Sequence, residues 1–217
     1  MSNRKTALLK LRHMKEQCEA TREAMKIEGQ RFEKLANQEV KAVAAVKLLQ
    51  TPEDIAELRV EQIIELAGEL HGKRILEPSA GLGRLYSAVR HASSKAHITL
   101  VENSPQCSKY LYGLTNGDLC QNQIQGDFLA CDQSRLGGMF DCALMNPPFK
   151  NGLDIKHIKH AYRFLKPGGV IVAICSAGPR QQRAFSQWHQ SPLPEKTFSS
   201  EGTNARTMIV SRIKDVD

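Results

Sequence analysis

From residue 73 onward, short runs of apolar residues alternate with segments in which apolar residues recur every three or four positions. Such an alternation predicts strands followed by helices, as in a parallel sheet that helices cover on both faces. Helices are expected at residues 83–91, 104–114 and 155–165, and strands at residues 74–77, 97–102, 123–125, 140–145, 170–176 and 207–213. The pattern therefore predicts an α/β domain.

The start of the chain has a different character, because residues 6–49 contain no proline and one glycine, Gly29. This segment predicts one helix, or two with a break near the glycine. Apolar residues recur there at heptad spacing, at Leu11, Cys18, Met25 and Phe32. Packing on the main domain and a homodimer through these helices both stay open. So does contact with nucleic acid, since residues 1–50 carry eleven Lys and Arg against six Asp and Glu. We predict an N-terminal helical extension (1–49) and a domain (50–217).

A further helix is expected to begin directly after residue 50. Thr51 is a good N-cap, Pro52 fits the first helical position, and the two acidic residues that follow complement the positive end of a helix. We expect this helix to end between Gly68 and Gly72.

Composition and charge limit the class of protein. A chain of 217 residues with 41% hydrophobic residues can hold one α/β domain and a short additional element. It has no apolar run long enough to span a bilayer and no signal peptide, so a cytoplasmic protein without a membrane partner is expected. The six cysteines are scattered, so no metal site is expected. The net charge of +7 suits a polyanionic partner such as nucleic acid.

The first predicted strand of this domain runs into a turn that suits a ligand. Small residues there would let a ligand approach the backbone at the carboxyl end of the strand. A purely structural turn would explain the glycines equally well, but the preceding Glu77 and Pro78 differ from a dinucleotide-binding loop and suit a cationic or amino-bearing ligand. The candidate ligand-binding residues of this turn are Glu77, Pro78, Ser79, Ala80, Gly81 and Gly83.

Acidic residues also follow the next two predicted strands. Glu102, with Asn103 after it, ends a strand about 20 residues past the glycine turn, where a carboxylate can bind both ribose hydroxyls of an adenosine ligand. Asp127 could accept a hydrogen bond from an adenine amine, with Phe128 closing over the ring. The alternatives are a solvated loop carboxylate for Glu102 and a helix-capping aspartate for Asp127.

The most informative residues are Asn146, Pro147, Pro148 and Phe149, directly after an apolar strand. Two prolines cannot continue a central strand, so the sheet must end there with a stiff backbone. The side-chain oxygen of Asn146 and the carbonyl of Pro147 could accept both hydrogens of a planar amine and turn its lone pair toward a methyl donor. Phe149 offers a face on which a flipped base could stack.

Together these motifs resemble the amino-methyltransferase family with an Asn/Asp-Pro-Pro-aromatic motif, in particular adenine-N6 DNA methyltransferases of phages and mobile elements. The resemblance covers about residues 50–213. It implies a Rossmann-like class I methyltransferase fold with a mostly parallel seven-stranded sheet. It also implies S-adenosylmethionine as cofactor, S-adenosylhomocysteine as product, and work in a bacterial or phage-infected cell. Thr51 and Pro52 resemble a Thr-Pro pair that packs against the methionine end of the cofactor in that family, and residue 146 would adjoin the cofactor too.

The residues after the tetrapeptide suggest how a substrate could bind. Arg180 and Arg183 lie in a basic stretch and are candidates for phosphate contacts. Trp188, the only tryptophan, could stack on a base or anchor the loop on the core. His157 and His160 would share one helical face, where a substrate-facing or exposed position is favoured over a metal.

Several functions stay open. The chain lacks room for the separate target-recognition domain that the resemblance would lead us to expect, so the substrate could be RNA (adenine N6 or guanine N2) or a protein glutamine. Phe149 in place of tyrosine favours a base, and DNA adenine N6 is the preferred target. A methyltransferase fold that binds nucleic acid without catalysis is the second alternative.

Overall fold

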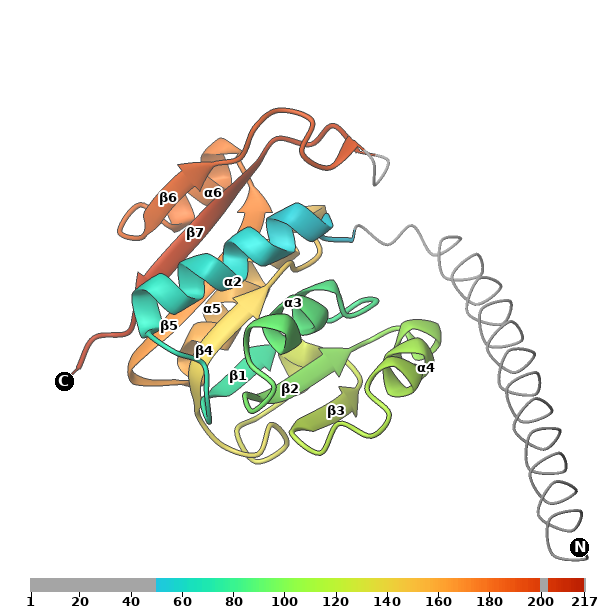
Figure 1. Cartoon of the computed structure of the whole chain (residues 1–217). Helices are drawn as coiled ribbons and strands as arrows, with labels where there is room; N and C mark the ends of the chain where they lie inside the picture. The colour runs from blue at the N-terminus through green and yellow to red at the C-terminus, as the bar shows by residue number, and fades with distance from the viewer. Residues whose placement is uncertain (1–49, 200–202, 217) are drawn as a thin grey trace, which may run out of the picture. The chain divides into compact units, whose positions relative to one another are not determined.

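A computed structural model describes residues 50–199 and 203–216 and shows a seven-stranded sheet with the order β3-β2-β1-β4-β5-β7-β6 (Figure 1). Strands β1 to β5 are parallel, whereas β7 is antiparallel to both of its neighbours. The strands are β1 (Arg74–Glu77), β2 (His97–Glu102), β3 (Gln121–Gln125), β4 (Phe140–Met145), β5 (Leu165–Ser176), β6 (His189–Pro192) and β7 (Thr207–Ile213). The predicted α/β class and mostly parallel sheet are confirmed.

Helices cover both faces of this sheet, as Figure 1 shows. One core layer joins Leu144 of β4 to apolar residues of α2, α3 and α4, and the other joins Met145 to α5. Alternate residues of a strand thus enter opposite layers, which explains the continuous apolar runs in the sequence. The helices are α2 (Glu53–Ala67), α3 (Arg84–Ala92), α4 (Pro105–Leu114), α5 (Leu153–Arg163) and α6 (Pro179–Ala184), with 3₁₀ turns η1 (Phe128–Ala130) and η2 (Lys150–Gly152).

The predicted boundaries hold for four of the seven strands. β1, β2, β4 and β7 have the expected bounds, whereas β3 begins two residues earlier. β5 begins at Leu165 instead of residue 170, because Leu165 pairs with Phe140 before a register irregularity in the β4–β5 ladder. The short α6 and the edge strand β6 were not predicted. β6 has the sequence His-Gln-Ser-Pro, which lacks apolar alternation, and proline is tolerated at a sheet edge.

The beginning of α2 also differs from the prediction. The helix begins at Glu53, Pro52 occupies the N-cap position, and no side chain caps the helix. The hydroxyl of Thr51 accepts a hydrogen bond from the Asn146 side chain instead. The helical extension at residues 1–49, and the homodimer that it would form, lie outside the described residues and stay predictions.

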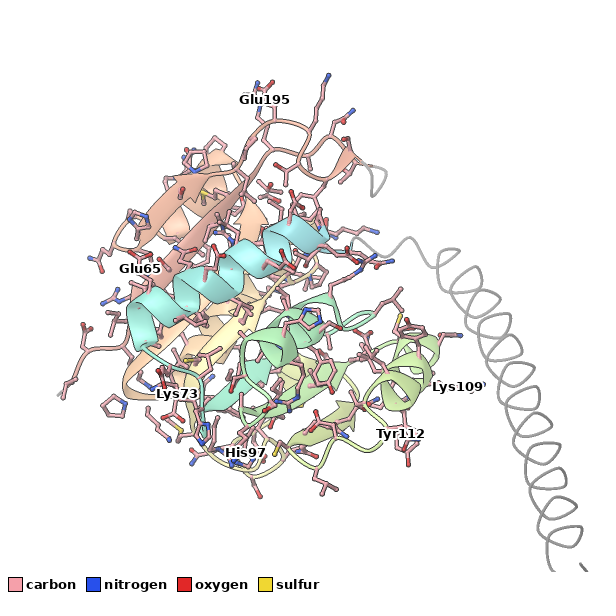
Figure 2. All side chains as sticks on the ribbon, in the orientation of Figure 1. Glu65, Lys73, His97, Lys109, Tyr112 and Glu195 are labelled. Carbon is pink, nitrogen blue, oxygen red and sulfur yellow. The ribbon has the colours of Figure 1, made fainter. Side chains whose placement is uncertain are left out.

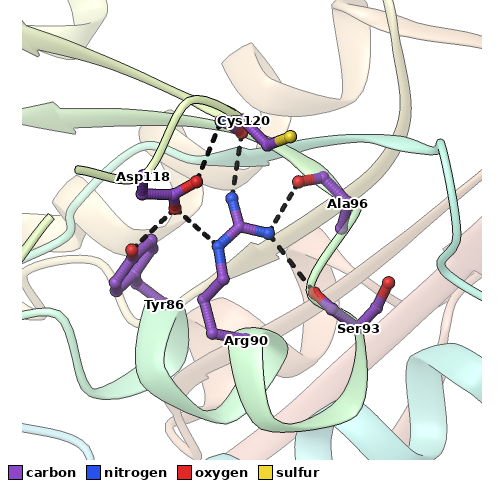
Figure 3. Close-up of polar contacts among 6 residues, drawn as sticks. All are labelled: Tyr86, Arg90, Ser93, Ala96, Asp118 and Cys120. Carbon is purple, nitrogen blue, oxygen red and sulfur yellow. Dashed lines mark hydrogen bonds and ion pairs between the residues drawn. The ribbon is translucent and has the colours of Figure 1, made fainter.

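A polar network lies at the amino ends of β2 and β3 (Figure 3). This end of the strands is opposite the carboxyl ends, where the candidate site lies. The Arg90 guanidinium donates to Asp118 at 2.6 Å, to the Ala96 carbonyl at 2.7 Å and to the Cys120 carbonyl at 2.9 Å. Burial alone would raise the pKa of Asp118, but hydrogen bonds from Tyr86, a backbone N–H and Arg90 lower it. The ion pair therefore ties α3 to the loop before β3.

Figure 2 shows Lys73 and His97 on this same edge, where β1 and β2 begin. Catalytic and ligand-binding candidates lie at the other ends of these strands. Within the described residues, no helix is both long and apolar enough to cross a membrane.

Candidate active site at the carboxyl ends of the strands

The topology brings the candidate residues to one place. The strand order reverses between β1 and β4, and parallel pairing aligns Leu76 with Ala143. Glu77 is therefore level with Leu144, and Asn146 follows two residues farther along the strand direction. In open α/β sheets, ligands bind outside the carboxyl ends of strands at such a reversal. The glycine turn and the tetrapeptide thus meet at this edge from neighbouring strands.

The glycine turn is shaped by backbone hydrogen bonds and by close packing. The Ala80 N–H donates to the Val101 carbonyl at 3.1 Å, and the Gly83 N–H donates to the Ala80 carbonyl at 2.8 Å. Gly83 has φ +78°, and a Cβ there would lie 2.7 Å from Leu114 and 2.9 Å from Leu111. Only glycine suits both the conformation and the space. The turn can therefore close tightly against α4 before α3 begins.

Glu102 joins two loops of this corner. Its side chain is 7% exposed, with Oε2 accepting from the Gly81 N–H at 2.8 Å and Oε1 accepting from the Ser104 N–H at 2.7 Å. This arrangement excludes the alternative of a solvated loop carboxylate. A carboxylate has about four acceptor sites, so these two bonds leave capacity for hydroxyl donors. Ribose binding by Glu102 stays a prediction that this geometry fits, and Asn103 lies exposed beside it.

Glu77 brings a second carboxyl group to the same corner. It is 3% exposed. Burial, and then the negative charge of Glu102, raise the pKa of Glu77 well above its ordinary value, although a hydrogen bond to the Tyr86 backbone opposes this effect. A cationic ligand group would relieve the repulsion between two carboxylates. The electrostatics of the corner therefore suit the cationic or amino-bearing ligand that the sequence suggests.

The end of β3 contributes an exposed acid and a buried ring. Asp127 Oδ1 accepts from the Leu129 N–H at 2.9 Å, so this carboxylate caps η1 as one of the sequence alternatives proposed. Phe128 is 2% exposed, and its ring centroid lies 4.9 Å from that of His160 and 6.3 Å from that of Phe164. The ring packs in the core layer beneath α5, which differs from the expected place over an adenine. Adenine binding by Asp127 stays a prediction.

The tetrapeptide ends β4 with one buried and one half-buried functional side chain. Asn146 is 9% exposed, and its Nδ2 donates to Thr51 Oγ1 at 3.1 Å. Pro147 is buried and Pro148 is exposed. Phe149 packs edge-to-face on Phe198, with ring centroids 6.2 Å apart. Asn146 and Phe149 are therefore each held by residues distant in the sequence.

Arg180 lies directly over the turn that follows the tetrapeptide. Gly152 has φ +71°, and a Cβ there would lie 2.6 Å from Arg180 Cζ and 2.7 and 2.8 Å from the two terminal nitrogens. These nearly equal distances show that the flat guanidinium covers the place of the missing side chain. Arg180 and Arg183 are both exposed on the short α6. Arg180 therefore lies at the turn itself, and phosphate contacts by Arg180 and Arg183 stay a prediction.

A buried carboxylate, whose role the sequence did not reveal, holds α6 in this place. Asp154 is fully buried and accepts from the Ser176 N–H at 3.1 Å and from Gln181 Nε2 at 3.0 Å. Asp154 lies in the first turn of α5. No pattern in the sequence indicated the hydrogen bond from Gln181, because α6 itself was not predicted. Asp154 thus fixes the helix that carries Arg180.

Trp188 does not lie at the tetrapeptide. Its ring centroid lies 5.1 Å from that of Tyr162 and 5.0 Å from that of Phe185. It precedes β6, which is three strands from β4 in the sheet and therefore about 14 Å away sideways. The prediction that Trp188 contacts the substrate is therefore wrong. The alternative holds, in which Trp188 anchors the chain on the core.

The two histidines of α5 also differ from expectation. His157 is 8% exposed, and its Nδ1 lies 3.4 Å from Ser79 Oγ in the glycine turn. Burial lowers the pKa of His157. His160 is half-buried against the Cys131 carbonyl at 3.0 Å. The expected substrate-facing or exposed position is thus wrong for His157, which supports the turn from below. Among the described residues, no three His, Cys, Asp or Glu side chains form a cluster that could hold a metal.

Known proteins resemble the chain over the region that builds this corner. The Methyltransferase small domain family matches residues 57–190. The rRNA N(6)-adenosine-methyltransferase metl-5 of Caenorhabditis elegans is 27% identical over 138 residues, which are 60% of this chain and 64% of that protein. Ribosomal RNA small subunit methyltransferase C of Haemophilus influenzae is 28% identical over 111 residues, 48% of this chain and 32% of that protein. The matched regions thus span 64% and 32% of the lengths of these two relatives.

Solved structures share the fold. The methyltransferase subunit of a type I restriction-modification system from Streptococcus thermophilus has a TM-score of 0.65 at 18% identity, covering 77% of this chain and 44% of that one. The 16S rRNA N2 G1207 methyltransferase of Thermus thermophilus, solved with AdoMet and guanosine, has a TM-score of 0.50 at 19% identity, covering 72% and 42%.

Proposed function

The chain belongs to the Methyltransferase small domain family, and from this premise we propose that it methylates an exocyclic amino group of a nucleobase in RNA. The observation that carries the proposal is the position of Asn146, which lies buried and hydrogen-bonded at the strand reversal where the glycine turn and Glu102 also lie. An amide oxygen and a proline carbonyl at this corner form the acceptor pair that orients an amine.

S-adenosylmethionine is the cofactor of this family, and the residues at the corner suit it. When bound, it supplies an activated methyl group on a sulfonium. Glu102 has the capacity to bind two ribose hydroxyls, and a cationic ligand group would favour the ionised form of the buried Glu77, whose pKa is raised by burial and by Glu102. Gly81 and the left-handed Gly83 keep side chains away from the backbone of the turn. Asp127 is exposed at the end of the neighbouring β3.

The tetrapeptide would orient the substrate. The Asn146 Oδ1 atom and the Pro147 carbonyl accept the two amine hydrogens, which favours a pyramidal nitrogen with its lone pair toward the methyl group. Phe149 stacks on the extruded base, a contact worth about 1–3 kcal/mol per base. Most of the rate acceleration then comes from proximity and alignment, because the methyl donor is already reactive.

RNA is proposed as the first substrate class for two reasons. The curated relatives are named as ribosomal RNA methyltransferases. The chain also carries a net charge of +7, and Arg180 lies beside the tetrapeptide where it can contact a phosphate. DNA adenine N6 is the second candidate, favoured by the resemblance of Asn146 to Phe149 to the motif of adenine-N6 DNA methyltransferases.

The test supplies purified protein with tritiated S-adenosylmethionine and four acceptors: rRNA stripped of protein, duplex DNA, single-stranded DNA and a mixture of cellular proteins. We expect label in RNA, at an initial rate about 10²–10³-fold lower with the Asn146→Ala variant. Label in DNA alone would transfer the assignment to the second candidate. Label in protein alone would contradict a nucleobase substrate. Cofactor binding without any transfer would support the non-catalytic alternative.

A further inference from the structure

The start of α2 contacts the tetrapeptide at both of its functional side chains. Thr51, which is 5% exposed, accepts the hydrogen bond from Asn146 Nδ2 at 3.1 Å. One turn farther, Ile55 belongs to a small buried cluster with Ile174 and Phe198, against which Phe149 packs. A segment 95 residues upstream of the tetrapeptide therefore holds the candidate acceptor at one end and the candidate stacking ring at the other.

The same segment also reaches the glycine turn. Arg84, the first residue of α3, forms an ion pair with Glu53, and its Nε donates to Gln50 Oε1 at 3.3 Å. The Arg84 and Glu53 side chains are 39% and 79% exposed, and solvent-exposed ion pairs contribute little to stability. The buried bond between Thr51 and Asn146 is consequently the stronger candidate for a functional link.

A hydrogen bond at Asn146 has a particular consequence for the proposed chemistry. A side-chain amide has an oxygen acceptor on one side and an NH₂ donor on the other, and exchanging them changes its shape very little. An orienting partner is needed to keep the acceptor toward a substrate amine. In the structure Nδ2 donates to the Thr51 hydroxyl, which restrains the amide with Oδ1 on its other branch.

We propose that Thr51 is a positioning residue that sets the direction of the Asn146 amide, so that Oδ1 faces the amine to be methylated. This rests on the proposed function. It also differs from what the family resemblance implies for Thr51, a contact with the methionine end of the cofactor. The two roles are separable, because a positioning role alters turnover whereas a cofactor contact alters cofactor affinity.

The experiment compares Thr51→Val, which keeps the shape and removes the hydroxyl, with Thr51→Ser, which keeps the hydroxyl. Thr99→Val is the matched control, because Thr99 is also 5% exposed but lies inside β2. We expect Thr51→Val to lower kcat on the methylated nucleic acid about 10- to 100-fold, since small misplacements of a catalytic group have effects of that size. Thr51→Ser should stay within about threefold of wild type. Calorimetry should give an unchanged Kd for S-adenosylmethionine.

A second measurement does not depend on activity. In ¹⁵N spectra, the side-chain NH₂ signals of Asn146 should shift or broaden in Thr51→Val and remain in place in Thr51→Ser and Thr99→Val. Unchanged signals, or an unchanged kcat in Thr51→Val, would overturn the proposal. So would a loss of activity explained entirely by weaker cofactor binding. If wild-type protein transfers no methyl group, the proposed function fails, and the spectra still decide whether Thr51 holds the amide.

Discussion

The two sides of the strand reversal are built by different kinds of contact. On the side of β1 and β2, the Glu102 carboxylate gathers backbone N–H groups of two short loops, Gly81 and Ser104. On the side of β4 and β5, side chains contact each other across long stretches of sequence, as Thr51 contacts Asn146 and Gln181 contacts Asp154. The first side is thus a backbone cradle, and the second an assembly of side chains.

This difference suggests a division of labour. A cradle of backbone groups presents the same shape whatever substrate arrives, which suits an invariant cofactor. An assembly of side chains from α2, α5 and α6 sets the direction of an acceptor and the position of a cation, which suits a variable substrate. Substitutions on the first side should therefore change cofactor affinity, and those on the second side should change turnover or nucleic-acid affinity.

The largest effect is expected for Asn146→Ala, which removes the proposed side-chain acceptor. Turnover should fall about 10²–10³-fold, the usual loss when one preorganised group that stabilises a transition state is removed. The Kd for S-adenosylmethionine, measured by calorimetry, should change less than twofold. Near wild-type turnover would contradict the role of Asn146, and a large loss of cofactor affinity would break the division between the two sides.

Next in size is Glu102→Ala, which removes both acceptors of the cradle. Hydrogen bonds to a charged group contribute about 1.5–3 kcal/mol, so the Kd for S-adenosylmethionine should rise about 10- to 100-fold. At saturating cofactor, kcat should recover to within a few-fold of wild type. A variant that binds the cofactor normally but turns over slowly would contradict the assignment of Glu102 to cofactor binding.

A smaller effect is expected for Gly152→Ala, which would push the Arg180 guanidinium off the turn. The Kd for nucleic acid should rise about 3- to 10-fold. The slope of log K against log salt concentration should decrease in magnitude by about 1, which corresponds to the loss of one phosphate contact, and Arg180→Ala should give the same decrease. The double variant should be no weaker than either single one. Gly72→Ala is the control, because Gly72 has a nearly identical φ of +70° and no atom within 4 Å of its Cβ position. Equal losses in the control would show that backbone strain, and not Arg180, is responsible.

The smallest expected effect concerns pH and His157, whose ring supports the cradle from α5. Burial lowers the pKa of His157 in the folded state, so the unfolded chain binds the proton at a higher pH than the folded protein does. Stability is therefore complete above the ordinary histidine pKa and falls as the pH drops below it toward the lowered value. Glu77, with a raised pKa, acts in the opposite direction. Melting temperatures of wild type and His157→Gln between pH 5 and 7.5 should converge on acidification, and parallel curves would contradict the prediction.

The same contrast explains what the sequence could predict. The cradle is encoded locally: an apolar strand, small residues in a turn and an acid at the next strand end. The predicted bounds of β1 and β2 are accordingly confirmed, and Glu102 lies where a ligand-binding carboxylate was expected. Pro147 and Pro148 likewise marked the end of β4, because prolines interrupt a ladder wherever they occur.

The contacts in the assembly of side chains could be predicted less well from the sequence. No local pattern pairs Thr51 with Asn146 or Asp154 with Gln181, because these contacts depend on how α2, α5 and α6 pack. The six-residue α6 and the polar β6 lack the periodicity that predicts longer elements. The sequence likewise left Trp188 open between stacking on a base and anchoring the loop, and its contacts with Tyr162 and Phe185 show the anchor.

The most direct test of the central claim, transfer to an exocyclic amine, identifies the atom that receives the methyl group. RNA and DNA are incubated with the protein and S-adenosylmethionine carrying a CD₃ group, digested to nucleosides and analysed by mass spectrometry. We predict the label on an exocyclic nitrogen, N6 of adenosine or N2 of guanosine, at an initial rate about 10²–10³-fold lower with Asn146→Ala. Label on a ring nitrogen, a ring carbon or a ribose oxygen would contradict the account.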